Sequence, residues 1–450
     1  MSRYRKEKRR SPRVPKKIAI TLPGNIRGHS VDMSEHGARM GTGETISSPT
    51  ISLQIKFPDK TVNIETEARL VWTRNLSESE ALYGLEFVGL DKQQKKILRK
   101  ELIELQISEL LKGIKNPKIK EKVSRFFLED VLSYITNIVQ FLPDMSNNGA
   151  YSPEIESELD SLTNKVLLKG YSLDVLLSDK AIMDQVKENF RKLVGTWVYK
   201  SDIVRRAFEK PRGYPGDYKM LEIVYDNETF TSGAGRYFDA TFLKSPYAVA
   251  VRIRKDQLRE LIGKYIKSSQ LERIKIFDIA CGSCREIREL IPELPSTKSV
   301  EFTFLDWDEE ALEFSREKFN ELDGRNLRYE YVQEDVMRLM RDKKVQSQFQ
   351  GQDFIYSIGL IDYLPDRILK RLIAVLYKLL NKQGRLVLTH KNRVKTFPPV
   401  PPDWFCDWKF YPRDRDEVLR LFLGCGIPRD AINIDVDNFG YIYYFTITKE

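Results

Sequence analysis

A basic motif near the start of the chain has the residue types to bind an anionic nucleotide. Arg9 and Arg13 stand in an R-x-x-x-R pattern that also contains Arg10. Guanidinium groups at this spacing can bind phosphates bidentately and stack on purine faces. Taken alone, the pattern fits a solvated basic arm equally well.

A polar motif, DMSEHG, follows the second β-prone run. Asp32 and Ser34 can accept from and donate to a base edge or a ribose, and Gly37 allows a turn through which a ligand approaches the backbone. An ordinary Asx turn is the alternative. Because both motifs occur in this order on a small β-rich segment, we favour ligand binding.

The C-terminal part carries a second arrangement, in which acids follow successive strands. The run IKIFDIA leads into CGSCREIREL, a glycine turn before a helix, and such turns bring backbone N–H groups against a nucleotide or a carboxylate. Asp306 ends the next strand, 28 residues after Asp278, where a carboxylate can accept both ribose hydroxyls. Asp335 follows RYEYVQ and could bind an adenine edge. Helix N-capping is the alternative, above all for Asp335.

The pair Cys281 and Cys284 has the spacing of a redox or zinc motif. A zinc site needs further ligands, and neither the two other cysteines nor the three histidines show ligand spacing. We therefore expect no metal.

The elements around these motifs change character along the chain. Short β-prone runs between Lys16 and Val88 suggest a small antiparallel barrel or sandwich, and residues 92–112 have helical spacing. A helix-rich segment runs to about residue 267, and its loop PRGYPGDY has the rigid turn chemistry of a pocket wall or of a structural turn. After Arg273, strands alternate with amphipathic stretches, and the tail forms an antiparallel hairpin, which predicts a mainly parallel sheet.

Composition limits the class of protein. The 450 residues are 41% hydrophobic and 31% charged, as in an ordinary soluble protein. The net charge is +9, but residues 1–30 contain ten Lys/Arg and one acid, which leaves 64 basic and 64 acidic residues elsewhere. The excess charge thus indicates a local anionic ligand rather than nucleic acid or anionic lipid. Four cysteines fit a reducing compartment, and we find neither a signal peptide nor a membrane span, so we expect a cytoplasmic protein.

The motifs RRSPR, DMSEHG and YGLEFVGLD resemble the PilZ family, bacterial domains that bind cyclic di-GMP, over about residues 3–110. In that family the arginines of the arm and the Asp, Ser and Gly of the second motif contact the dinucleotide. The resemblance implies that the ligand contacts here are Arg9, Arg13, Asp32, Ser34 and Gly37, with Arg10 beside them.

The motifs DIACGSC, FTFLDWD, QEDVM, DFIYSIGLIDYL and GRLVLTH resemble class I S-adenosylmethionine-dependent methyltransferases over about residues 270–450. The final hairpin fits, since that fold reverses its last strand. The resemblance implies S-adenosylmethionine as cofactor. Its methionine part would meet Asp278, Ala280 and Gly282, its ribose Asp306, and its adenine Asp335 and Val336. The usual GxGxG core reads A-C-G-S-C here, with the bulkier Cys284 last.

The motifs RGYPGDY, YSIGLIDYLPD and DWFCDWKFYPRD look like a group of bacterial methyltransferases named for biosynthesis of 3-hydroxypalmitic acid methyl ester. This implies a fatty-acid carboxylate or another small-molecule acceptor. We expect it to meet Tyr214, Asp217, Tyr218 and Tyr363.

The nature of the acceptor decides whether a base is needed. A carboxylate needs only alignment with the methyl group, whereas an amine or hydroxyl must lose a proton. His390, at the end of LVLTH, is the candidate base, and Tyr356 and Asp362 are the other candidate catalytic residues.

We therefore expect a multidomain α+β and α/β protein: a PilZ-like antiparallel β-barrel over residues 1–112, a helical linker and substrate cap over 113–267, and a Rossmann-like class I methyltransferase domain over 268–450. The expected function is a methyltransferase that responds to cyclic di-GMP. A non-catalytic cyclic di-GMP effector that binds a partner through a degenerate methyltransferase fold is the alternative, and a protein or small-amine methyltransferase is a further one. A homodimer is one option for assembly.

Overall fold

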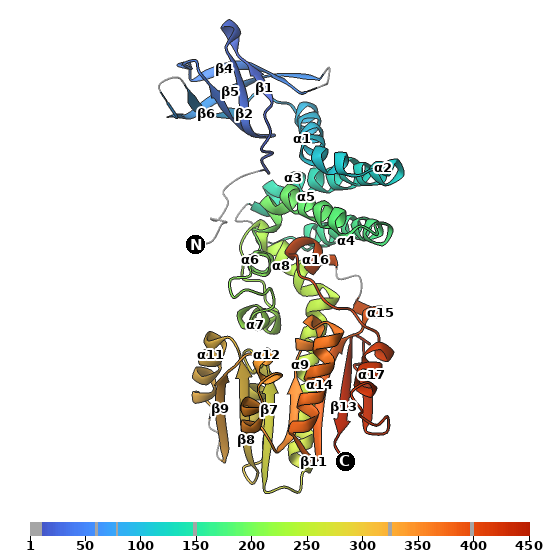
Figure 1. Ribbon diagram of the computed structural model, residues 1–450. Helices are drawn as coiled ribbons and strands as arrows, with labels where there is room; N and C mark the ends of the chain where they lie inside the picture. Colours follow the sequence, from blue (N-terminus) through green and yellow to red (C-terminus); the bar gives the residue numbers. More distant parts are fainter. Residues whose placement is uncertain (1–10, 59–61, 78–79, 147–150, 323–325, 397–399) are drawn as a thin grey trace. The chain divides into compact units, whose positions relative to one another are not determined.

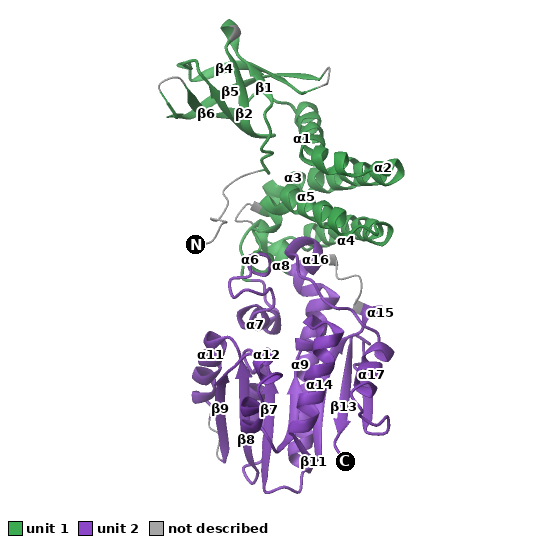
Figure 2. Cartoon of the chain, viewed as in Figure 1, with its two compact units in different colours: residues 1–205, 230–239 green, residues 206–229, 240–450 purple. Residues whose placement is uncertain are grey.

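The computed structural model describes residues 11–58, 62–77, 80–146, 151–322, 326–396 and 400–450. The chain, coloured along its sequence in Figure 1, forms two compact units, which Figure 2 colours separately. The first unit comprises residues 1–205 and 230–239, and the second comprises residues 206–229 and 240–450. These bounds differ from those of the three domains expected from the sequence, and that division stays a prediction.

The first unit begins with a closed barrel of six antiparallel strands in the order β1-β2-β3-β6-β5-β4. The strands are β1 (Ala19–Thr21), β2 (Arg27–Ser34), β3 (Gly37–Thr42), β4 (Thr50–Lys56), β5 (Asn63–Asn75) and β6 (Ala81–Phe87). Alternate residues of β4 point into the barrel, so that Ile51, Leu53 and Ile55 are buried there. The expected antiparallel barrel is confirmed. The strand β3 was not predicted, because GARMGT has two glycines and no β-branched residue before its last position.

Helices make up the rest of the first unit. Four of these helices begin at an N-cap residue whose side chain accepts hydrogen bonds from N–H groups of the first turn. The N-caps are Asp91 for α1, Asn116 for α2, Ser152 for α4 and Asp179 for α5. The helices are α1 (Lys92–Gly113), α2 (Pro117–Arg125), a π-helical turn (Phe126–Val131), α3 (Leu132–Ser146), α4 (Pro153–Leu176) and α5 (Lys180–Val198). Two further helices, α6 (Asp202–Glu209) and α8 (Ala234–Lys244), cross the boundary of the units.

The second unit is built on a sheet of seven strands in the order β12-β13-β11-β10-β7-β8-β9. The strands are β7 (Arg273–Ile279), β8 (Ser299–Asp306), β9 (Leu327–Gln333), β10 (Gln352–Ser357), β11 (Leu380–Lys391), β12 (Ile432–Val436) and β13 (Ile442–Thr448). Those from β7 to β11 are parallel, and β13 runs antiparallel to β11 and β12. The predicted sheet and its final hairpin are confirmed.

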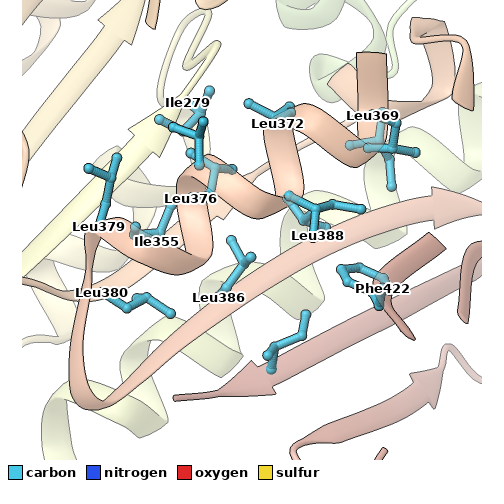
Figure 3. Close-up of a cluster of buried hydrophobic side chains, with 14 of the residues drawn as sticks. Ile279, Ile355, Leu369, Leu372, Leu376, Leu379, Leu380, Leu386, Leu388 and Phe422 are labelled. Carbon is cyan, nitrogen blue, oxygen red and sulfur yellow. The ribbon is translucent and has the colours of Figure 1, made fainter. Parts of the chain in front are cut away.

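Helices pack on this sheet. Leu369, Leu372 and Leu376 of α14 recur at helical spacing and are fully buried in a cluster with Ile355 and Leu388 of the strands (Figure 3). The described helices that lie wholly in the second unit are α7 (Tyr218–Asp226), α9 (Pro246–Ser268), α10 (Arg285–Leu290), α11 (Glu309–Asn320), α12 (Val336–Leu339), α13 (Lys343–Gln348), α14 (Asp366–Leu379), α15 (Arg393–Thr396), α16 (Val400–Cys406) and α17 (Arg415–Leu423). Among the described residues, no helix is both long and apolar enough to span a bilayer.

Candidate functional site

A cavity of about 410 Å³ lies at the carboxyl ends of the parallel strands in the second unit. Ligands of open α/β sheets bind at this end, because the loops that follow the strands meet there. Five of the six predicted cofactor residues line the cavity: Ala280, Gly282, Asp306, Asp335 and Val336.

The turn after β7 has a strained backbone. Ala280, Gly282 and Cys284 have φ angles of 57°, 55° and 49°, the left-handed region that glycine adopts without cost. These are the three positions that carry glycine in the GxGxG pattern. The turn therefore has left-handed backbone at all three glycine positions of the pattern, although only the middle glycine, Gly282, is present here.

The sixth predicted cofactor residue, Asp278, is buried just before this turn and does not line the cavity. Its Oδ2 has no hydrogen-bond partner among the described residues. Burial, and then the nearby carboxylate of Glu286, raise the pKa of Asp278 well above its usual value. The Tyr356 hydroxyl donates to Glu286 Oε1 at 2.7 Å, so the predicted catalytic Tyr356 belongs to this buried acid cluster.

Asp306 joins β8 to the turn. Asp306 Oδ2 accepts from the Gly282 N–H at 2.8 Å, and its Oδ1 accepts from the Asp308 N–H at 2.9 Å. The N-cap of the following helix, α11, is Asp308 and not Asp306. Asp335 lines the cavity and also caps α12 by accepting from the Met337 N–H at 2.7 Å. The capping alternative therefore holds for Asp335 and not for Asp306.

The PRGYPGDY loop forms another wall of the cavity. Arg212 donates from Nε to Asp308 Oδ2 at 2.9 Å, and its NH1 lies 2.5 Å from Glu310. This anchor sets Tyr214 beside Trp307, with ring centroids 5.8 Å apart. The loop is thus fixed to the segment that follows β8.

Three of the four predicted substrate residues line this cavity: Tyr214, Tyr218 and Tyr363. Asp217 does not. It is fully buried, caps α7 through the Met220 N–H and pairs with Arg206 at 2.8 Å. Its contacts are therefore structural.

The predicted catalytic residues His390 and Asp362 lie outside the cavity lining, as Tyr356 does. His390 is 1% exposed, its Nε2 accepts from the Arg413 N–H at 3.2 Å, and its Nδ1 lies 2.8 Å from Asp362 Oδ1. Burial by itself raises the pKa of Asp362, but Lys391, His390 and Arg254 outweigh it and hold that pKa far below its usual value. Because both ring nitrogens of His390 face protein groups, its role as a base stays a prediction without geometric support.

Sequence reasoning missed several residues of the cavity wall, among them Arg254, Trp307, Gly359 and Leu360. Trp307 could have been found, since it follows Asp306 directly. Arg254 could not, because α9 precedes the first strand and no motif marks this arginine.

Asp278, Cys281 and Cys284 are the one group of candidate metal ligands among the described residues, with ligand atoms within 4.8 Å of one another. Burial raises the pKa of the Cys281 thiol well above its usual value and that of Cys284 to about 11. A structural zinc site takes four protein ligands, and this group supplies three, so it does not complete a structural zinc site. The expectation that the chain holds no metal stays a prediction.

The predicted nucleotide motifs of the barrel meet at Asp32. Arg13 donates to Asp32 Oδ1 at 2.5 Å, and Arg39 donates from Nε to Oδ2 at 2.7 Å. Burial alone would raise the pKa of Asp32, but the hydrogen bonds from Arg39 and Arg13 hold it below its usual value. Arg9 and Arg10 lie outside the described residues.

The DMSEHG motif spans the β2–β3 hairpin rather than the predicted turn. Asp32 and Ser34 belong to β2, and Gly37 begins β3. A Cβ on Gly37 would lie 2.1 Å from the carbonyl oxygen of Leu85, so glycine is required by the close pairing of β3 with β6. Access of a ligand to the backbone, which the sequence suggested as the reason for Gly37, is not needed to explain this glycine.

A cavity of about 200 Å³ lies beside these residues on the barrel. Arg13 and Ser34 line it together with Ser11, His36 and Trp72. The indole of Trp72 lies over Gly84, where a Cβ would come within 2.2 Å of Nε1, and Trp72 is 41% exposed. Sequence reasoning missed Trp72, although an exposed aromatic residue beside arginines is a signal of base stacking.

Residues 7–104 match the PilZ domain, and residues 277–386 match a methyltransferase domain. The chain carries a PilZ domain and a methyltransferase domain. The match to a methyltransferase domain gives the enzyme class as methyltransferase. A search of curated proteins gave no match.

Similar solved structures have low sequence identity. A carbon methyltransferase, CurJ, is 15% identical over 78% of this chain and 98% of that one, with a TM-score of 0.40. A magnesium protoporphyrin IX methyltransferase from Synechocystis with bound SAM is 13% identical over 45% of this chain and 83% of that one, at 0.33. A structure described as a possible exported protein from Bordetella parapertussis is 14% identical over 75% of this chain and 99% of that one, with a TM-score of 0.41.

Proposed function

We propose that the protein is a cyclic di-GMP-responsive methyltransferase that transfers the methyl group of S-adenosylmethionine to a small-molecule acceptor. The observation that carries the proposal is the cavity whose wall contains Ala280, Gly282, Asp306, Asp335 and Val336 inside the matched methyltransferase unit. A fatty-acid carboxylate, such as that of a 3-hydroxy acid, is the favoured acceptor.

The cavity fits the cofactor in two respects. A Cβ on Gly282 would meet only Tyr218 and Leu221, at 3.9 and 4.0 Å, so the bare glycine leaves a cradle for a ligand. Asp306 and Asp335 also line the cavity, and their carboxylates can accept hydrogen bonds from hydroxyl and amino groups of a ligand. When bound, S-adenosylmethionine supplies an electrophilic methyl group on its sulfonium.

The chain's own residues would orient the reactants. Asp306 is fixed by two backbone N–H groups and can still accept ribose hydroxyls with its remaining lone pairs. Tyr214, Tyr218 and Tyr363 give the acceptor side an aromatic wall. A carboxylate acceptor agrees with a wall that contains no histidine among the described residues, since an anionic nucleophile needs no base.

Cyclic di-GMP is the proposed regulator. Arg13, Ser34 and Trp72 around the barrel cavity support binding of a dianionic dinucleotide, with Arg9 and Arg10 as further candidate contacts. Regulation requires that the dinucleotide bind one state of the enzyme better than another.

Calorimetry of the full chain tests the proposal. We expect S-adenosylhomocysteine to bind, and its affinity to change after saturation with cyclic di-GMP. Binding of the dinucleotide without any binding of S-adenosylhomocysteine would favour the non-catalytic effector, for which the reduced glycine core is the supporting observation.

A further inference from the structure

Arg254 of α9 is buried in the wall of the methyltransferase cavity. Only 3% of the residue is exposed, and it lines the same cavity as Gly282 and Asp306. A Cβ on Gly359 would lie 2.7 Å from both terminal nitrogens of Arg254, so the guanidinium lies flat against this glycine. Any side chain at position 359 would therefore collide with the guanidinium of Arg254.

The guanidinium is incompletely partnered. Its NH1 lies 3.3 Å from Asp362 Oδ2, and its Nε has no hydrogen-bond partner among the described residues. A buried donor without a partner is costly, and arginine has five donors in a fixed fork. The remaining donors of Arg254 are therefore available to a ligand.

Asp362 is shared between two buried cations. Lys391 Nζ donates to the same Asp362 Oδ2 that Arg254 approaches, at 2.7 Å. Asp362 therefore leaves most of the Arg254 fork without a partner. A buried guanidinium with unpartnered donors beside a cavity favours an anionic ligand group.

We propose that Arg254 binds a ligand carboxylate in this cavity, with Asp362 as the positioning residue that holds the guanidinium from the opposite side. The planar fork matches a carboxylate bidentately. The inference rests on the proposed function and deepens it. Two ligands of that reaction carry a carboxylate: the methionine part of the cofactor and a carboxylic-acid acceptor.

Calorimetry with Arg254→Gln separates these sources. The probes are S-adenosylhomocysteine, 5′-methylthioadenosine, which lacks the amino-acid part, and 3-hydroxydecanoate added to the complex with S-adenosylhomocysteine. If the cofactor supplies the carboxylate, the variant binds S-adenosylhomocysteine about 10- to 100-fold more weakly and 5′-methylthioadenosine unchanged. If the acceptor supplies it, the variant loses 3-hydroxydecanoate binding by a similar factor and keeps both nucleosides.

Two further variants make the result decisive. Arg259→Gln, on the same helix but paired with Glu293 and outside the cavity lining, should bind all probes as the wild type does. Arg254→Lys keeps the charge and loses the fork, so we expect an intermediate affinity.

Three results would overturn the assignment. Wild-type affinity of Arg254→Gln for both carboxylate probes would remove Arg254 as the receptor. Loss of 5′-methylthioadenosine binding by both Arg254 variants would give the residue a purely structural role. Failure of the wild type to bind S-adenosylhomocysteine would overturn the proposed function, and this inference with it.

Discussion

Glu35, inside the DMSEHG motif, forms a buried ion pair with Arg99 of α1. Arg99 Nε donates to Glu35 Oε2 at 2.7 Å, and the two side chains are 11% and 3% exposed. Arg99 also donates from NH1 to Thr136 Oγ1 of α3 at 2.9 Å. The hairpin proposed to bind the dinucleotide is therefore joined directly to two helices of its own unit.

Loss of Arg99 should destabilise the first unit. Arg99→Met leaves Glu35 as a buried carboxylate without its cation, which costs about 3 kcal/mol, and the double variant Glu35→Gln/Arg99→Met should recover much of that loss. Hydrogen exchange of the amides of β2 and α1 measures the effect. Arg69→Met is the control, because its pair with Glu86 is 63% and 36% exposed and contributes under about 1 kcal/mol. Equal protection in Arg99→Met and the control would refute the prediction.

The same ion pair should carry the effect of ligand into the helices. We expect cyclic di-GMP to slow amide exchange in α3 of the wild type, because it fixes the hairpin that holds Arg99. In Glu35→Gln/Arg99→Met the dinucleotide should bind with similar affinity and leave exchange in α3 unchanged. Persisting protection of α3 in the double variant would show that another path connects them.

The pairing of Asp32 with Arg39 predicts a pH dependence. The folded-state pKa of Asp32 is lowered, so the pair stabilises the barrel above the ordinary carboxyl pKa, and this contribution is lost as the pH falls through the folded-state value. Arg39→Gln should therefore lose up to about 1 kcal/mol at pH 7, since Arg39 is 40% exposed, and progressively less as the pH falls through the folded-state pKa of Asp32. Urea unfolding over a series of pH values measures this difference, and a loss that does not change with pH would contradict it.

Trp72 should contribute to dinucleotide affinity by stacking on a base. Truncation of a stacked aromatic side chain costs about 1–3 kcal/mol per base, so Trp72→Ala should bind cyclic di-GMP about 10-fold more weakly, while Trp72→Phe should retain most of the affinity. Calorimetry gives the affinities. Unchanged affinity in Trp72→Ala would place the bases elsewhere.

Much of this architecture could be predicted because it follows from local patterns. The acids at the ends of β7 and β8 and the glycine turn are fixed by chain order in a parallel sheet, so Gly282 and Asp306 were predicted and do meet at one cavity.

The features of the site that could not be predicted from the sequence depend on side-chain direction and on long-range packing. His390 ends the predicted strand, yet its ring is buried against Asp362 and Arg413 rather than facing the cavity. Asp217 is an acid that could contact a substrate, but its carboxylate pairs with Arg206 and caps α7. Arg254 reaches the cavity only because Gly359, 105 residues later, lacks a side chain.

The turn after β7 gives the last prediction, which separates backbone strain from ligand contact. The φ angle of 57° at Ala280 is strained for a residue with a side chain, so Ala280→Gly should relieve about 1 kcal/mol of strain in the folded state. The greater freedom of glycine in the unfolded chain offsets part of this gain. Gly282→Ala should lose about 1 kcal/mol for the reverse reason, and its new Cβ would also project into the proposed cofactor space.

Thermal unfolding and calorimetry with S-adenosylhomocysteine measure the two effects on the same variants. We expect Ala280→Gly to keep or raise cofactor affinity, and Gly282→Ala to lose at least about 10-fold, more than its stability change explains. If Gly282→Ala bound the cofactor as the wild type does, the turn would be retained for the fold alone. The reduced glycine core would then support the effector alternative.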